Sequence, residues 1–204
     1  MLSKKTMTFG LVLLFLVALM GCAKVPQQAV DAAKAALDAA KSAEADRYAT
    51  DMFNAAKDTL DAAMAEIETQ NGKFALTRSY GTAEKLLAGA TAAANSAVEA
   101  AAANKTKVQA EAQQLLADAK TAIDNSKAML KKAPRGKESR AAIEAMQNDI
   151  TAIETMLGEA NTAMTAGDYL TARDKASASI SKANSIAEEV KMAMEKKKAL
   201  AGKR

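Results

Sequence analysis

Few side chains in this 204-residue sequence could carry out acid–base, nucleophilic or metal chemistry. The chain has no histidine and a single cysteine, Cys22. These counts exclude a histidine base, a zinc site of cysteines and histidines, and an internal disulfide. Carboxylates are plentiful, but they lie beside lysines at helix-surface spacing, as Asp61 does after Lys57. We therefore predict no catalytic or metal-binding residues and no enzymatic activity, although a hydrolase with paired carboxylates stays open.

The N-terminal segment predicts a secretory signal. Lys4 and Lys5 precede an apolar run from Phe9 to Met20 that is too short to cross a bilayer as a mature helix. The only cysteine follows at once, in Leu19-Met20-Gly21-Cys22. This motif resembles the lipobox of bacterial lipoproteins, in which small or apolar residues precede an obligatory cysteine. An uncleaved signal anchor with an incidental cysteine is the alternative.

The resemblance to bacterial lipoproteins implies that the signal is cut before Cys22. The cysteine would carry a thioether-linked diacylglycerol and an acylated amino group, and the several chains would hold the protein to a membrane permanently. Ala23 follows, rather than the aspartate associated with inner-membrane retention, which favours the outer membrane and a periplasmic location. Sorting rules vary among bacteria, so the inner membrane and the cell surface stay open. We expect no cofactor besides these acyl groups.

The composition predicts an all-α protein. Alanine accounts for 51 residues, aromatic residues for only 3%, and just two prolines interrupt the chain. Alanine, lysine, glutamate and leucine in this proportion favour helices over strands. Alanine offers little bulk to bury, but it lets helix axes approach closely. We expect an elongated antiparallel bundle or coiled coil.

About five helices are predicted, because apolar residues recur every three or four positions. The cleanest stripe comprises Ile143, Met146, Ile150, Ile153, Leu157, Ala160 and Met164. Expected helix starts and caps are Pro26, Asp46, Phe74, Ser139 and Asp168, and expected stops are Asn71-Gly72-Lys73, Pro134-Arg135-Gly136 and Ala166-Gly167. We also expect a kink or register change near Asn104-Lys105-Thr106. Gly81, Gly89 and Gly158 within helices are either close-contact points or tolerated weak positions.

The predicted organisation has five parts. They are the signal peptide 1–21, an anchored segment with the first helix 22–45, a helical hairpin with a long helix 46–133, a second hairpin 134–190 and a basic tail 191–204. The hairpins match at an offset of 95 residues, which suggests a duplication. Apart from the turns, however, most of the matched positions are alanine in both hairpins. The same heptads would satisfy pairing within one chain or between chains, so self-association stays open.

Positive charge is concentrated in the tail. Without Lys4 and Lys5, the chain has 26 basic against 24 acidic side chains, and the tail alone carries Lys191, Lys196, Lys197, Lys198, Lys203 and Arg204 against Glu195. The tail could contact anionic lipid headgroups, bind an acidic polymer such as peptidoglycan, or keep a frayed helix end soluble. No aromatic residues interleave with these lysines to stack on bases, so we expect no nucleic acid partner.

From Asp46 onward, the turns Gly72-Lys73-Phe74 and Gly167-Asp168-Tyr169 between alanine-rich helices are similar to an uncharacterised family of bacterial envelope lipoproteins. The resemblance implies an exported helical hairpin, sometimes joined to peptidoglycan-binding domains, without established catalytic residues. We therefore expect a non-enzymatic periplasmic spacer or protein-interaction scaffold. The alternative is an amphipathic helical carrier of a lipid or another apolar ligand.

Overall fold

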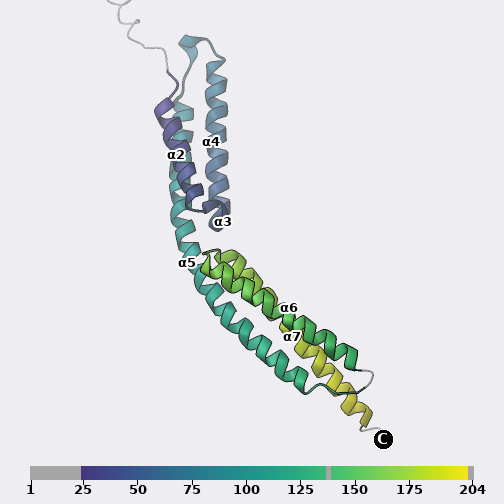
Figure 1. Cartoon of the computed structure of the whole chain (residues 1–204). Helices are drawn as coiled ribbons and strands as arrows, with labels where there is room; N and C mark the ends of the chain where they lie inside the picture. The colour runs from purple at the N-terminus through teal and green to yellow at the C-terminus, as the bar shows by residue number, and fades with distance from the viewer. Residues whose placement is uncertain (1–23, 137–138, 202–204) are drawn as a thin grey trace, which may run out of the picture. The chain divides into compact units, whose positions relative to one another are not determined.

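The structure, a computed structural model, describes residues 24–136 and 139–201, in which all regular secondary structure is helical (Figure 1). This confirms the predicted all-α class. Six α-helices and one short 3-10 helix occur in these ranges. They are α2 (Gln27–Ser42), α3 (Ala45–Tyr48), α4 (Thr50–Asn71), η1 (Ala75–Thr77), α5 (Gly81–Lys131), α6 (Arg140–Thr165) and α7 (Tyr169–Ala201).

The chain divides into two compact units, one up to Ala102 and the other from Ala103 onward. The division falls inside α5, which contributes its first part to one unit and its second part to the other. Of the kink or register change predicted near Asn104-Lys105-Thr106, the register change is wrong, and the kink stays a prediction. Lys105 and Val108 are half-buried and continue the three–four spacing from buried Ala101 to buried Ala112, and α5 is helical throughout.

The first unit is a three-helix bundle of α2, α4 and the first part of α5 (Figure 1). Each helix contributes an apolar stripe at the predicted spacing. The predicted helix start at Phe74 is wrong, because η1 and an extended segment follow it and α5 begins only at Gly81. The core comprises Val30 and Ala33 of α2, Leu60, Ala63 and Ile67 of α4, Tyr80 just before α5, and Ala83, Leu87 and Ala90 of α5. The helices pack against one another because each has one apolar stripe to remove from water.

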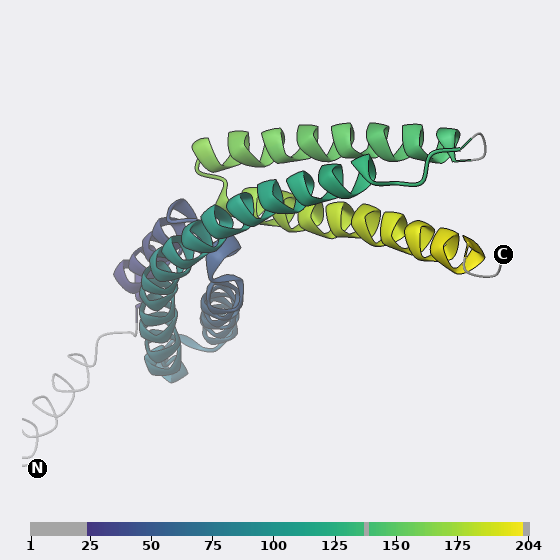
Figure 2. The same cartoon turned by 90° about the horizontal axis from the view of Figure 1, so that it is seen from below.

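The second unit is a three-helix bundle of the second part of α5, α6 and α7, which lie side by side in Figure 2. Its core includes Ile123 of α5, Ile150 and Ile153 of α6, and Ile186 and Val190 of α7. A buried serine links two of these helices. Ser126 Oγ lies 2.6 Å from the carbonyl oxygen of Ala183 in α7 and 2.7 Å from that of Ala122 in its own helix.

The connection between α2 and α4 differs from the prediction. Asp46 does not cap the second long helix, because a separate short helix, α3, intervenes and contains it. Glu44 before α3 adopts a left-handed conformation with φ of 59°, and α4 begins only at Thr50. A four-residue helix makes a single turn and has no repeating apolar stripe, so the apolar periodicity of the sequence does not predict α3.

Of the predicted N-cap residues Asp168 and Ser139, only Asp168 caps its helix. Asp168 caps α7 as predicted, and its Oδ1 accepts a hydrogen bond from the Thr171 N–H at 3.4 Å. Ser139 precedes α6, but its hydroxyl bonds into the preceding loop, donating to the Pro134 carbonyl at 2.7 Å and accepting from the Gly136 N–H at 2.9 Å. Its predicted capping role is therefore wrong.

The two glycine turns are not equivalent. Gly167 has the left-handed φ of 81° that ends a helix, whereas Gly72 remains right-handed with φ of −70°. Phe74 and Tyr169, which match at the offset of 95 residues, also differ, because Phe74 is 73% exposed and Tyr169 is half-buried. Both units share the order helix, helix, glycine turn, helix, but the first has a longer connection that includes η1.

Two of the three helical glycines are not close-contact points. A methyl group built on Gly81 or Gly158 would meet no atom of a neighbouring element within 4 Å. One built on Gly89 would meet Thr59 Cγ2 at 3.8 Å, an ordinary contact distance. Gly158, which lies inside α6, therefore lowers helix stability without a packing reason, whereas Gly81 is the first residue of α5.

We expect Gly158→Ala to raise the free energy of unfolding by about 0.5–1 kcal/mol, because alanine is the better helix former and space is available. Gly167→Ala should lower it by roughly 1 kcal/mol or more, since a Cβ is disfavoured at a positive φ. Urea unfolding followed by circular dichroism measures both. A destabilised Gly158→Ala variant would show that this glycine does make a close contact.

Candidate polyanion-binding site

The predicted basic residues lie partly on a helix. Lys191, Lys196, Lys197 and Lys198 occupy the last turns of α7, which continues to Ala201. The predicted basic tail 191–204 is therefore a continuation of the last helix at these four lysines. Lys203 and Arg204 lie outside the described residues, and so does the predicted lipobox of Leu19, Met20, Gly21 and Cys22.

The four lysines do not form one face. Lys191 Nζ lies 3.5 Å from Glu188 Oε2, and both side chains are more than half exposed. Lys198 is seven residues further along, so it shares the face of Lys191. Lys196 and Lys197 instead border a cavity of about 300 Å³ between the end of α7 and the beginning of α6.

This cavity combines apolar walls with positive charge. Its lining includes Pro134 of the α5–α6 loop, Ile143 and Met146 of α6, and Val190 and Leu200 of α7. Among the described residues, none forms an ion pair with Lys196 or Lys197. The arrangement suits an anionic group that carries an apolar portion, because the two lysines supply charge and the walls supply contact area.

Cations of the α5–α6 loop lie at the same end of the second unit and were missed by the sequence analysis. Arg135 and Arg140 border one further cavity, and Lys131 and Arg135 border another. In Figure 1 the end of α5, the beginning of α6 and the end of α7 meet there. We call this set the basic end. It comprises Lys131, Lys132, Arg135, Arg140, Lys191, Lys196, Lys197 and Lys198.

A sequence signal for these loop residues exists. The run from Lys131 to Arg140 holds five basic side chains and one acid. In an antiparallel three-helix bundle, the end of the first helix, the beginning of the second and the end of the third share one end of the bundle. Together, that topology and the charge run predict that the basic residues of this loop lie at the same end of the bundle as the lysines of α7.

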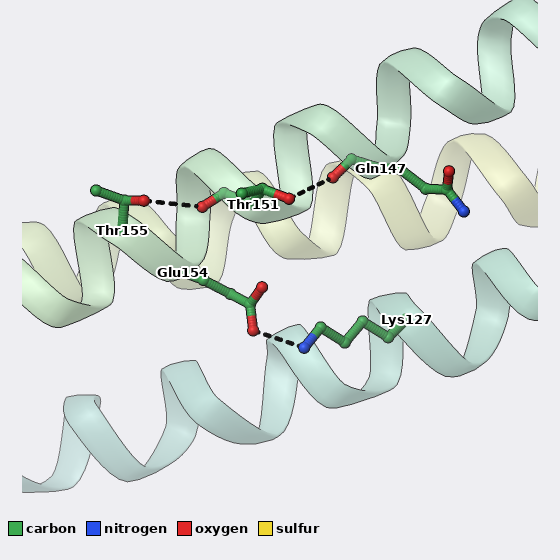
Figure 3. Close-up of polar contacts among 5 residues, drawn as sticks. All are labelled: Lys127, Gln147, Thr151, Glu154 and Thr155. Carbon is green, nitrogen blue, oxygen red and sulfur yellow. Dashed lines mark hydrogen bonds and ion pairs between the residues drawn. The ribbon is translucent and has the colours of Figure 1, made fainter.

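Not every cation at this end is available for a partner. Lys127 Nζ of α5 contacts Glu154 Oε1 of α6 at 2.6 Å, as Figure 3 shows. On α6, the hydroxyls of Thr151 and Thr155 donate to the backbone carbonyls of Gln147 and Thr151, one turn earlier, each at 3.1 Å. Glu144 also borders the cavity of Arg135 and Arg140. The uncompensated charge therefore lies mainly on the loop and on α7.

Acidic side chains elsewhere lie where the sequence predicts solvated helix faces. Lys57 Nζ and Asp61 Oδ2 are 3.5 Å apart, with both side chains more than half exposed. Within the described ranges, no three histidine, cysteine, aspartate or glutamate side chains gather as a metal site would require. No described helix combines the length and hydropathy needed to cross a membrane.

Comparisons with known proteins add no family to these observations. No protein-family model matches the chain, and neither the curated proteins nor the solved structures contain a significant match. The resemblances to bacterial lipoproteins and to an alanine-rich envelope family therefore stay predictions, and the residues themselves must support any functional argument.

Proposed function

We propose that the protein is a non-enzymatic lipoprotein of the cell envelope, anchored through acylated Cys22 to the outer membrane and facing the periplasm. It acts as a helical spacer or scaffold that docks an anionic polymer, with peptidoglycan as the candidate, through its basic end. The observation that carries the proposal is the convergence of Arg135, Arg140, Lys196 and Lys197 from separate elements on one end of the second unit.

The position of these cations favours binding over a purely solubilising role. Charges that serve solubility alone need only be spread over the surface, whereas these border cavities at one end of a bundle. The side chains come from the α5–α6 loop, α6 and α7, so a bound polymer would contact several elements at once. Cations near the C-terminus of α7 also interact favourably with the negative end of the helix dipole, and this interaction stabilises the last helical turns.

The length of α5 supports a spacing role. α5 is a continuous helix of 51 residues, which corresponds to about 75 Å of contour at 1.5 Å per residue. It contributes to the cores of both units. A chain that is attached at its N-terminal end and basic at its C-terminal end could link a membrane to a polymer beyond it.

The anchor can be tested by replacing its acylation site. We expect Cys22→Ser to move the protein from the membrane fraction to the soluble fraction almost completely, because no acyl chain can be attached. Fractionation of the producing cells, with immunodetection, measures this. Retention of the variant on membranes would contradict the proposed anchor.

The basic end can be tested by sedimentation of the acyl-free mature chain with purified peptidoglycan. A triple charge reversal, Arg135→Glu, Lys196→Glu and Lys197→Glu, should weaken binding roughly tenfold or more, because attraction becomes repulsion. Lys34→Glu, Lys41→Glu and Lys85→Glu form the control, since these exposed lysines of the first unit give the same net charge. Equal binding by the two triple variants, or no binding by the parent chain, would contradict docking at the basic end.

The carrier function is a second candidate because of the apolar lining of the cavity beside Lys196 and Lys197. An amphiphile with an anionic head could place its chain against Ile143, Met146 and Val190. Native mass spectrometry of protein purified from membranes distinguishes the two functions. One bound lipid per chain, beyond the chains on Cys22, would favour the carrier over the scaffold.

A further inference from the structure

The connection between α4 and α5 exposes two large apolar side chains. Phe74 precedes η1 and is 73% exposed, and Leu76 lies within η1 and is 76% exposed. They are the most exposed large hydrophobic residues in the part of the chain that the structure describes. Two such neighbours at the tip of a connection form a small apolar projection, a feature typical of contact sites. We call Phe74, Leu76 and the turn between them the apolar tip.

The apolar tip is held outward by a set of hydrogen bonds. Arg78 donates to the carbonyl of Lys73 at 3.0 Å and to that of Asn71 at 2.9 Å, which fixes the turn around Phe74 and Leu76. The backbone N–H of Ser79 donates to Gln70 Oε1 at 3.1 Å. These bonds tie both sides of the connection to the end of α4.

The side chain of Tyr80 is the buried counterpart of the exposed Phe74. Tyr80 is 4% exposed and belongs to the core of the first unit, and its hydroxyl donates to Asn71 Oδ1 at 2.5 Å. The connection thus places one aromatic side chain in the core and another in solvent. The exposure of Phe74 is therefore a consequence of a structured turn rather than of an unfolded loop.

The apolar tip lies at the same end of the first unit as the start of the described chain (Figure 1). One cavity is bordered by Val25 to Ala29 and by Glu84, which places the beginning of α2 beside the first turn of α5. Cys22 is only two residues before Lys24, and two residues span at most about 7 Å. An anchor at Cys22 would therefore bring this end of the unit to the membrane surface.

The charges near the apolar tip suit a surface of anionic or zwitterionic headgroups. Lys24 and Lys73 are exposed there, and Val25 adds a further partly exposed apolar side chain. Glu68 and Glu84 are the nearby acids on α4 and α5. Cations that flank exposed phenylalanine and leucine side chains are typical of segments that rest in the headgroup region of a bilayer.

We infer that the apolar tip inserts into the headgroup–acyl boundary of the leaflet that holds Cys22, and thereby orients the first unit on the membrane. This inference rests on the proposed anchor. Two side chains offer too little area to hold a protein on a membrane alone, so the acyl chains supply attachment and the tip supplies orientation.

A tryptophan probe tests the inference, because the chain has no tryptophan of its own. The acylated full-length Phe74→Trp protein is reconstituted into phosphatidylethanolamine–phosphatidylglycerol vesicles with and without brominated acyl chains. Met52→Trp is the matched control, since Met52 is 40% exposed in the first turn of α4, at the opposite end of that helix. We expect bromine to quench the probe at residue 74 roughly twofold or more and to leave the probe at residue 52 unquenched.

Flotation of the same vesicles separates failure of the tip from failure of the anchor. If the Phe74→Trp protein floats with the vesicles but is not quenched, the inference is wrong and the anchor stands. If its emission is shifted to the blue without quenching and depends on protein concentration, a second copy covers the tip and the inference is also wrong. If the protein does not float, the anchor itself is wrong and the inference falls with it.

Discussion

The fold depends on helices packing through alanine. Among the residues that the structure describes, most of the side chains that are completely buried are alanines, such as Ala63, Ala83, Ala94, Ala160 and Ala183, and the large apolar side chains with under 2% exposure are Leu87 and Val190. Burying a methyl group contributes little transfer free energy, so the helices must approach closely for their alanine contacts to stabilise the fold. Close approach in turn leaves little room for larger residues at these alanine positions, and it lets the Ser126 hydroxyl of α5 reach a backbone carbonyl of α7. Larger side chains share both cores with these alanines, Leu60 and Leu87 in the first unit and Ile150 and Ile186 in the second.

The same constraint determines where function can reside. The interior of each bundle is filled by the side chains that hold it together, so the groups available to a partner must come from helix ends and connections. Two such places stand out. The α4–α5 connection projects Phe74 and Leu76 from a turn fixed by Arg78, and the basic end gathers Arg135, Arg140, Lys196 and Lys197 around small cavities. The proposed anchor, spacer and docking site assign one task to each part of the chain.

The long elements could be predicted from the sequence, because stripes such as Ile150, Ile153 and Ala160 repeat at helical spacing over several turns. Single residues at connections could not. Ser139 has the chemistry of an N-cap, yet its hydroxyl bonds to the loop, and Gly72 stays right-handed where Gly167 does not. The basic end was found only in part, because its α5–α6 half becomes visible once the bundle topology brings Pro134 of the α5–α6 loop to the cavity that Lys196 and Lys197 of α7 border. The local apolar pattern thus specifies the long helices, whereas the tertiary arrangement determines the caps, turns and contacts at their ends.

The most direct test of close alanine packing is the free energy of unfolding of chains in which one buried alanine carries added bulk. Ala94→Leu in the first unit and Ala183→Leu in the second should each lose about 2 kcal/mol or more, because the neighbouring helix must move to admit three more carbons. The exposed counterparts Ala92→Leu and Ala145→Leu should change stability by at most about 0.5 kcal/mol. Buried substitutions that leave stability unchanged or raise it would contradict the claim that alanine sets the spacing of these helices.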